Sequence, residues 1–191
     1  MEDYVKALKM PFTDIGKLAM YILLSIVPVI NFAAWGYLLD VAQTSMKRKT
    51  KLPKFKSFWK LFVEGLKCLL ITVVYLIPLI IAVILLVFSA PFLSVSSTVA
   101  LVILILLITL PFATLGILRY AEKRKTEEAF NIKQILKKMN MKFFPGWLMS
   151  LLIASVIQFV LSKIPIIGIP FGAGVSGIFY MSAMGSVYSK C

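Results

Sequence analysis

Two long apolar runs dominate the middle of the chain. Leu69–Phe88 and Thr98–Leu118 each hold about 20 residues, carry no charged side chain and are rich in Leu, Ile and Val, which is what a membrane-crossing helix requires. Between them, Ser89–Ser97 has no charge and combines Pro91 with several serines, a composition suited to a tight connection. The pattern therefore predicts two transmembrane helices joined as a hairpin.

Two further apolar runs lie near the C-terminus. They extend over Phe144–Leu161 and Ile164–Tyr188 and are separated by Ser162 and Lys163. The second run is interrupted near its start by residues that break helices and form turns, namely Pro165, Gly168 and Pro170. This region predicts a second helical hairpin.

The N-terminal apolar region has two interpretations. Ile15–Ser45 is too long for one ordinary crossing and has Pro28 in its middle. One long kinked helix would make five spans in all and put the N-terminus outside. Two short helices, about Phe12–Val27 and Val29–Gln43, would make a third hairpin and put the N-terminus inside, although each is near the minimum length and short enough to be re-entrant.

The distribution of basic residues favours the second interpretation. Sixteen of the 21 basic residues lie within Met46–Lys67 and Arg119–Lys142, which the positive-inside rule places in the cytoplasm. With six segments the N-terminal lysines also lie inside, and Lys163 is the one basic residue left outside. We therefore predict an all-α, polytopic membrane bundle of about six segments in three hairpins, with both termini cytoplasmic and with Ser94–Ser97 and Lys163–Gly168 outside.

A weak internal repeat accompanies the three hairpins. In each, the returning helix has a proline before it and a glycine that opens a stretch of small residues. These pairs are Pro28 and Gly36, Pro111 and Gly116, and Pro170 and Gly177. The alternative is that apolar helices rich in Leu, Ile, Gly and Pro resemble one another by chance, and the sequence leaves both interpretations open.

A basic and aromatic stretch comes directly before the first long run. Within Lys54–Lys67 the apolar side chains recur at helical spacing on one face, and the lysines fall elsewhere. A helix of this kind lies flat on a bilayer with its aromatic side down. The residues expected to contact lipid here are Lys54, Lys56, Phe58, Trp59, Lys60 and Phe62.

A second basic stretch, Thr126–Asn140, has the same character. Thr126 suits a helix N-cap, and two acids follow in the first turn, where the helix dipole favours them. Its apolar face contains Ile132, Ile135, Leu136 and Met139, and its lipid-contact candidates are Lys133, Lys137 and Lys138. Both stretches could bind anionic lipid or a partner protein, but the simpler interpretation, that they are anchors and topology signals, is the one that we favour.

Composition supports a single membrane domain over residues 1–191. Of the 191 residues 60% are hydrophobic and 15% charged, and the mean hydropathy is +0.94, well above ordinary soluble domains. The net charge of +13 points to anionic lipid headgroups on the cytoplasmic face as partners. Nucleic acid is not expected as a partner, because the aromatic residues of the basic stretches lie on the face predicted to enter lipid.

Composition argues against most hydrolases and metalloenzymes. There is no histidine, so the usual proton shuttle and the commonest metal ligand are both absent. Cys68 and Cys191 have no metal-site spacing and are expected to be free thiols. The chain has no P-loop, nucleophile elbow or dinucleotide fingerprint. We therefore expect no catalytic, cofactor or metal site.

Charged and polar residues of the apolar regions complete this picture. Asp40, Glu64 and Arg119, like the other charges that border the spans, fall at predicted helix ends, so no span is expected to bury a charge. The polar residues at depth are expected to bond between helices: Asn31, Thr72, Tyr75, Thr109, Thr114 and Gln158. The glycines expected at close helix contacts are Gly36, Gly116, Gly168, Gly172 and Gly177.

Several short motifs in the first part of the chain resemble a known family. They include Asp3–Asp14, Val27–Ile30, Gly36–Leu39, Leu52–Phe55, Phe62–Lys67 and Val74–Pro78. Together they are similar to the uncharacterised, mainly archaeal membrane family called domain of unknown function 4013. The resemblance implies a polytopic membrane protein, and it transfers no catalytic or binding residue because the family has no established activity.

Three functions follow from these observations. The first is a non-enzymatic membrane protein that acts through lipid or protein contacts, as an assembly or membrane-organising subunit. The second is an oligomeric transporter or channel component for an apolar or weakly polar solute, and the third is a membrane enzyme. A large exposed apolar patch would favour assembly, a polar cavity lined by Asn31, Thr72 or Gln158 would favour transport, and Asp40 and Glu64 clustered with lysine in one pocket would favour an enzyme.

Overall fold

The chain forms a helical protein. The computed structural model describes residues 2–89, 94–165 and 167–191, and every regular element within these ranges is helical. The elements are α1 (Glu2–Lys9), the 3-10 helix η1 (Met10–Thr13), α2 (Ile15–Ile26), α3 (Asn31–Met46), α4 (Phe58–Ser89), α5 (Val95–Lys123), α6 (Thr126–Ala129), α7 (Ile132–Lys138), α8 (Phe143–Leu161) and α9 (Gly168–Tyr188). The predicted all-α class is confirmed.

The N-terminal apolar region forms two helices and not one kinked helix. The Asp14 side chain caps α2 by accepting a hydrogen bond from the backbone N–H of Lys17 at 3.1 Å. The helix ends where Val27 becomes extended, directly before Pro28, which disfavours helical conformation in the residue preceding it. With 12 residues, α2 is about 18 Å long, shorter than a bilayer core of about 30 Å.

Three helices are long and apolar enough to cross a membrane, within the described part of the chain. They are Phe58–Phe88, Ser96–Lys123 and Phe143–Leu161, and they contain the three strongest predicted spans. The connection between the first two includes residues 90–93, which lie outside the described residues. The six-segment arrangement therefore remains a prediction beyond these three helices.

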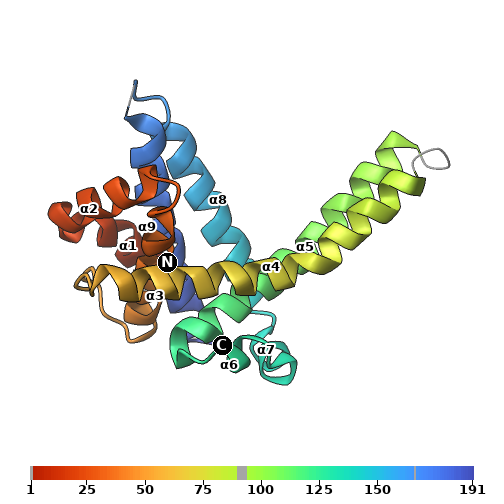
Figure 1. Cartoon of the computed structure of the whole chain (residues 1–191), viewed down its shortest axis with the longest axis horizontal. Coiled ribbons are helices and arrows are strands. Elements are labelled where there is room, and N and C mark those ends of the chain that lie inside the picture. The colour runs from red at the N-terminus through yellow and green to blue at the C-terminus, as the bar shows by residue number, and fades with distance from the viewer. Residues whose placement is uncertain (1, 90–93, 166) are drawn as a thin grey trace.

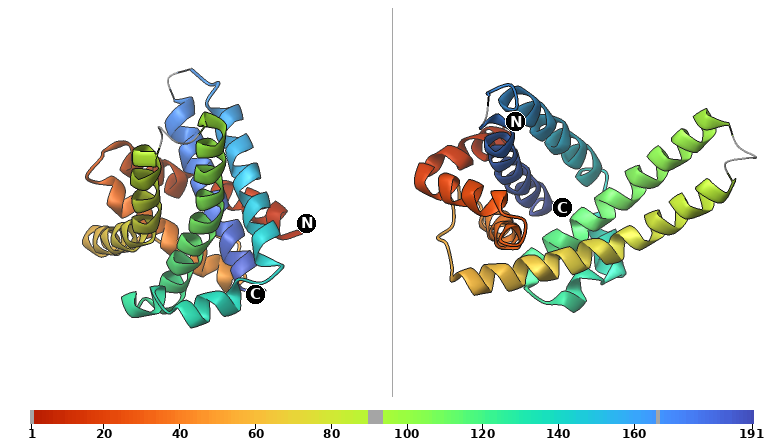
Figure 2. Two further views of the ribbon diagram at one scale, coloured as in Figure 1. Left: turned by 90° about the vertical axis from the view of Figure 1, so that its right-hand side faces the viewer. Right: turned by 45° about the horizontal axis from the view of Figure 1, so that its top comes forward.

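The outer halves of α4 and α5 project from the rest of the molecule as a hairpin. Figures 1 and 2 show the two helices side by side and extending away from the other elements. We call residues 73–88 and 96–110 the arm, and the remaining elements the body. No side chain of the arm is buried.

The core of the body is built around α3 and α9, which contact each other. Ala33, Ala34 and Ala42 of α3 and Ile178 and Phe179 of α9 are fully buried. Around this pair, α1, α2 and α8 pack against α9, and α4 packs against α3. Small side chains line the crossings, so the helix backbones approach closely.

The closest approach is between α3 and α4. A Cβ atom added to Gly36 would lie 2.0 Å from the carbonyl oxygen of Leu61, and one added to Gly65 would lie 1.7 Å from that of Phe32. Neither distance is possible for a real side-chain atom. The crossing therefore requires glycine on both helices.

The structure differs from the prediction of two flat amphipathic helices. Residues 52–57 are not helical, and α4 runs without a break from Phe58 through the apolar run, because no turn residue separates the two. Residues 126–140 form α6 and α7, which are separated at Phe130 and Asn131. Lys125, and not Thr126, is the N-cap of α6, and it makes no side-chain cap hydrogen bond.

The three helix pairs of the suggested repeat are unequal. The first helices have 12, 32 and 19 residues in α2, α4 and α8, whereas an exact repeat would give equal lengths. The returning helices α3, α5 and α9 do contact one another. The repeat stays a prediction.

Candidate functional site

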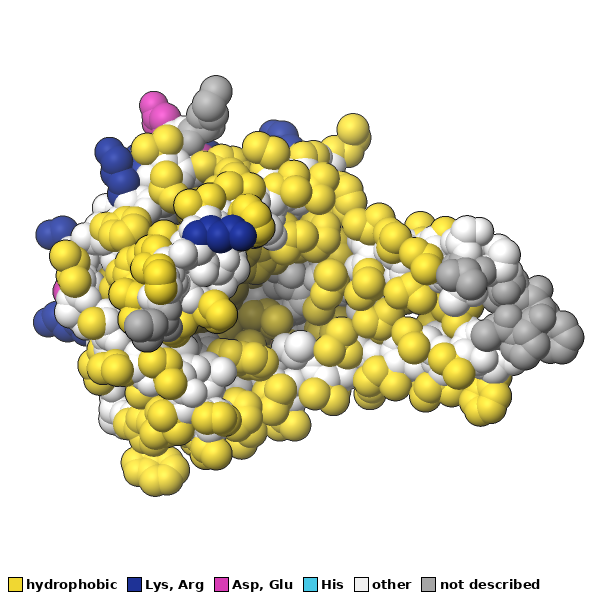
Figure 3. Space-filling view, turned by 90° about the horizontal axis from the view of Figure 1, so that it is seen from above, with side chains coloured by type: hydrophobic (Ala, Val, Ile, Leu, Met, Phe, Trp, Pro, Cys, Tyr) yellow, Lys and Arg dark blue, Asp and Glu magenta, His cyan; other side chains and the backbone are white. Residues whose placement is uncertain are grey.

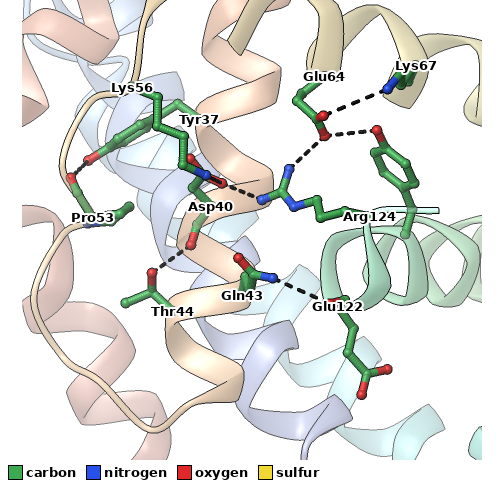
Figure 4. Close-up of polar contacts among 11 residues, drawn as sticks. Tyr37, Asp40, Gln43, Thr44, Pro53, Lys56, Glu64, Lys67, Glu122 and Arg124 are labelled. Atoms are coloured by element: carbon green, nitrogen blue, oxygen red, sulfur yellow. Dashed lines mark hydrogen bonds and ion pairs between the residues drawn. The ribbon is translucent and has the colours of Figure 1, made fainter. Parts of the chain in front are cut away.

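A buried carboxylate on α3 is held by two cations. Asp40 is 3% exposed, and its Oδ1 accepts hydrogen bonds from Lys56 Nζ at 2.7 Å and from the guanidinium of Arg124. Lys56 lies in the loop before α4, and Arg124 directly follows α5. Figure 4 shows these side chains converging from separate segments.

The same arginine reaches a second carboxylate, on α4. Arg124 Nη1 donates to Oε2 of Glu64 at 2.9 Å, and the Tyr120 hydroxyl donates to the same oxygen at 2.8 Å. Arg124 thus bridges Asp40 and Glu64 and ties α3, α4 and α5 together (Figure 4). We call Asp40, Lys56, Glu64, Tyr120 and Arg124 the polar clamp.

The backbone conformation of Arg124 is part of this geometry. Its φ is 56°, in the left-handed region, and its N–H donates to the carbonyl oxygen of Tyr120 at 2.7 Å. Glycine is the usual residue where a helix ends in this way, and another residue costs about 1–2 kcal/mol. In this position the Arg124 side chain makes both ion pairs.

The polar clamp borders a small cavity of about 260 Å³ that Gln43 and Lys60 also line. The structure thus brings Asp40 and Glu64 together with lysine in one pocket, the arrangement that would favour an enzyme. Both carboxylates accept hydrogen bonds from cations, and Oδ2 of Asp40 is buried without a hydrogen-bond partner among the described residues. This geometry holds helices together, and no group of three Cys, Asp or Glu suited to a metal ion occurs in the described residues.

The expectation that charges lie at helix ends is wrong for this region. Asp40 lies inside α3 and Arg119, which is 8% exposed, inside α5. The reason is that the helices are longer than predicted: α3 continues to Met46 and not only to Gln43, α5 continues to Lys123, and α4 begins at Phe58 and not at Leu69, which puts Glu64 inside a helix as well. The helices extend past their apolar runs, and these polar extensions pack against one another in the body.

A second polar group joins α5, α6, α7 and α9. Arg119 donates to Glu128 at 2.5 Å, and the Tyr188 hydroxyl donates to Glu122 at 2.8 Å. Lys138 Nζ donates to the carbonyl oxygen of Tyr188 at 3.3 Å and lies 4.7 Å from the centroid of its ring. Together with the polar clamp, this group fastens the inner end of the hairpin to the body.

Comparison with known proteins identifies the family. A family model described as "Protein of unknown function (DUF4013)" matches residues 20–166, which is more than half of the chain. The chain belongs to this family. No curated protein and no solved structure gives a significant match.

The DUF4013 match contains the whole polar clamp, from Asp40 to Arg124, and the arm. It begins within α2 and ends before α9. The resemblance to the family is therefore confirmed, although the motif Asp3–Asp14 lies outside the matched residues. No residue role comes with it, because the family description states none.

The aromatic lipid-contact candidates of this DUF4013 protein form one cluster, in which the ring centroids of Phe58, Trp59 and Phe62 are 5.9–6.0 Å apart. Phe58 and Trp59 are exposed, whereas Phe62 packs against Phe32 with ring centroids 5.8 Å apart. Lys54 and Lys60 are exposed, and Lys56 is engaged by Asp40. In the second stretch, Lys133 and Lys137 are exposed and Lys138 is engaged by Tyr188.

The predicted glycines lie at helix contacts with different clearances. A Cβ added to Gly116 would lie 2.4 Å from the Tyr75 ring, and one added to Gly168 would lie 2.4 Å from the carbonyl oxygen of Leu161. Gly172 faces Gln158 at 3.2 Å, and Gly177 faces the Tyr21 hydroxyl at 3.1 Å. Sequence reasoning missed Gly65, where the clearance is only 1.7 Å, and Gly185, where it is 2.4 Å as at Gly116, because neither stands in a small-residue spacing that it used.

The polar residues at depth bond partly within and partly between helices. Thr114 lies 3.3 Å from the Tyr180 hydroxyl, and Ser176 donates to Gln158 at 3.2 Å, whereas Thr72 donates to the carbonyl oxygen of Cys68 in its own helix. Gln158 lines a surface cavity of about 460 Å³ between α8 and α9. Asn31 and Thr72 do not line it.

Proposed function

We propose that this protein is a non-enzymatic membrane subunit that assembles or organises membrane components through lipid and protein contacts. The observation that carries the proposal is the arm, a paired apolar hairpin. Only its base is covered in the described chain, where the Tyr75 hydroxyl donates to the carbonyl oxygen of Ala129 at 2.6 Å and its ring stacks on Phe130. Figure 3 shows hydrophobic side chains along the arm, while Lys and Arg side chains in this view lie over the body. Apolar surface of this extent requires lipid or another protein to cover it.

The proposed orientation puts the body at the cytoplasmic face. The basic segment 46–67 runs into the start of α4, and the basic segment 119–142 begins near the end of α5. The positive-inside rule therefore orients the arm outward from the cytoplasm. Six segments, cytoplasmic termini and contact with anionic headgroups belong to this proposal. The polar clamp then lies near the inner membrane surface, where its charges cost less than at the bilayer centre.

Photo-crosslinking from the arm tests the proposal. Benzoylphenylalanine in place of Ile81 or Leu85, both exposed, should form a protein adduct of one defined mass in native membranes, because a subunit presents the arm to a fixed partner. Ile71 lies on the same helix and is fully buried, so it is the matched control and should give no such adduct. Lipid adducts alone at both arm positions would overturn the assembly role and leave the arm as an anchor.

The surface cavity at Gln158 supports the second candidate, a transporter or channel component. Ser155, Gln158, Ser162 and Ser176 give this cavity polar groups within an otherwise apolar helix pair. Liposomes containing the protein would then pass a small, weakly polar solute, and Gln158→Leu would slow the flux. Equal flux in liposomes that contain the unaltered protein and in protein-free liposomes would remove this candidate.

A further inference from the structure

A polar cavity of about 350 Å³ lies in the body, away from the arm. It is bounded by α1, the chain that follows α3, and the last turns of α9, three segments that are far apart in sequence. At its floor, the buried hydroxyls of Ser45 and Ser182 are 2.9 Å apart, with Ser45 as the donor. Both hydroxyls line the cavity together with those of Ser186 and Ser189.

The charge of the cavity is strongly positive. Its lining includes Lys6, Arg48, Lys49 and Lys190 against one carboxylate, Asp3. Asp3 is already paired with Lys190, and this hydrogen bond lowers the pKa of its carboxyl group. Arg48 and Lys49 form no ion pair with any residue in the described ranges, so their charge is not compensated within the chain.

Capping of helix ends does not account for these cations. The carbonyl oxygens at the end of α3 accept backbone hydrogen bonds from Lys47 at 3.3 Å, Arg48 at 2.9 Å and Lys49 at 3.1 Å. At the end of α9, the carbonyl oxygens of Gly185 and Val187 likewise accept from Ser189 and Lys190. The side chains of Arg48 and Lys49 are therefore not needed as caps.

Arg48 also occupies an unusual backbone position. Its φ of 58° lies in the left-handed region, where glycine would fit without strain. The arginine in this position brings a guanidinium group to the cavity and is followed directly by Lys49. The cavity thus combines arginine and lysine side chains with several hydroxyl donors in a concave site. Such a set of donors binds the oxygens of a phosphate group.

We propose that this cavity binds a phosphate group, carried either by a membrane lipid headgroup or by a small soluble molecule. The inference goes beyond the proposed function, because the arm contributes nothing to the cavity. The phosphate would sit between Arg48 and Lys49 and the serine floor. It would join three chain segments that few other polar contacts connect.

Binding measurements on the full-length protein in phosphate-free detergent solution test the proposal. Two probes are used at constant ionic strength: inorganic phosphate, and phosphatidic acid compared with diacylglycerol of the same chains. Arg48→Gln with Lys49→Gln should weaken binding about 10-fold or more, because hydrogen bonds from charged groups are lost. Lys47→Gln with Lys51→Gln changes the charge equally in the same loop outside the cavity and should leave the affinity unchanged.

The outcomes separate the two sources of phosphate. Binding of phosphatidic acid but not of phosphate or diacylglycerol indicates a lipid headgroup, whereas binding of inorganic phosphate indicates a site for the phosphate group alone. Ser182→Ala, which keeps all charges, should also weaken binding. It replaces the double variant in the test if circular dichroism shows that the double variant is unfolded. Equal weakening by the two double variants, or no binding of either probe to the unaltered protein, would show that the proposal is wrong.

Discussion

Arg124 is the residue on which the inner end of the hairpin depends. It pairs with Asp40 on α3 and with Glu64 on α4 while it ends α5. A buried carboxylate is tolerated only when it is paired, because its desolvation is expensive. The strained backbone at this position is thus tied to a charge that glycine could not supply.

Arg124→Gln should therefore lower the free energy of unfolding by about 3 kcal/mol, because Asp40 would keep a buried charge with less compensation. Lys123→Gln is the control, since Lys123 is exposed and only reaches its neighbour Glu122 at 3.9 Å, and its effect should stay below about 1 kcal/mol. Denaturant unfolding in detergent measures both variants. Similar small losses in both would show that the polar clamp contributes little.

Trp59 and Trp147 differ in exposure, and quenching of their fluorescence by lipid can measure this difference. Trp59 is 71% exposed and Trp147 is 2% exposed. In brominated lipid bilayers, a protein that keeps Trp59 alone should be quenched strongly, and one that keeps Trp147 alone weakly, because quenching needs contact with the lipid. Quenching of Trp59 as weak as that of Trp147 would mean that Trp59 does not face the membrane.

At the scale of elements, the helix crossings decide the architecture of the body. The α3–α4 crossing is closed by glycine on both sides, and the α3–α9 crossing has Gly185 with an added Cβ only 2.4 Å from the carbonyl oxygen of Ala42. Backbone atoms cannot move aside as a flexible side chain can. These crossings are therefore less tolerant of substitution than contacts between large side chains.

Gly65→Ala should destabilise the protein by about 1–3 kcal/mol, because the added methyl group meets the Phe32 carbonyl and forces α3 and α4 apart. Gly16→Ala is the control: its Cβ would lie 3.5 Å from the Asp14 side chain, an ordinary contact. Thermal unfolding followed by circular dichroism compares the two. A Gly65→Ala protein as stable as the control would contradict the close crossing.

Gly177→Leu tests a contact between α9 and the N-terminal helices. The position faces the Tyr21 hydroxyl at 3.1 Å and Leu38 at 3.8 Å, so a leucine side chain should overfill the contact and lower the melting temperature. The same thermal measurement applies. An unchanged melting temperature would indicate that the space at Gly177 is open.

At the scale of the whole molecule, the body and the arm have different surfaces. The charged residues lie in the body, where polar contacts join the helices. The arm is apolar and its side chains are not buried (Figure 3). Asp3 and Lys190 pair, so the two ends of the chain lie together in the body. A membrane orientation that puts one end of the chain in the cytoplasm therefore puts the other there too.

Single-cysteine labelling measures this orientation. In a protein with Cys68→Ala and Cys191→Ser, an impermeant maleimide should modify Ser96→Cys and not Thr50→Cys in intact cells, because the connection between α4 and α5 is predicted outside and the basic loop inside. Thr50→Cys should react after the cells are opened, which controls for access. Labelling of Glu2→Cys from outside would contradict six segments and support five.

Much of the fold could be predicted from the sequence. The apolar runs within α4, α5 and α8 are long enough to predict membrane-crossing helices without any knowledge of their neighbours. Asp14 and Pro28 mark the limits of α2 through local backbone chemistry. The amphipathic stretch at 54–67 was predicted less well. Its periodicity identifies the helical part from Phe58 onward, but nothing local shows that this helix continues into the apolar run or that Phe55 stacks on Tyr37 with ring centroids 4.2 Å apart.

The sequence by itself determined that the chain is helical, apolar and basic, because length, hydropathy and charge are local properties. Tertiary structure alone decided that Asp40, Glu64 and Arg124 meet, and that residues 3–6, 45–50 and 182–190 enclose one polar cavity. The first of these depends on the α3–α4 crossing at Gly36 and Gly65, and the second on the α3–α9 crossing at Gly185. A crossing is a property of two surfaces together. The hydrophobic periodicity of one segment does not predict which other segment it will contact.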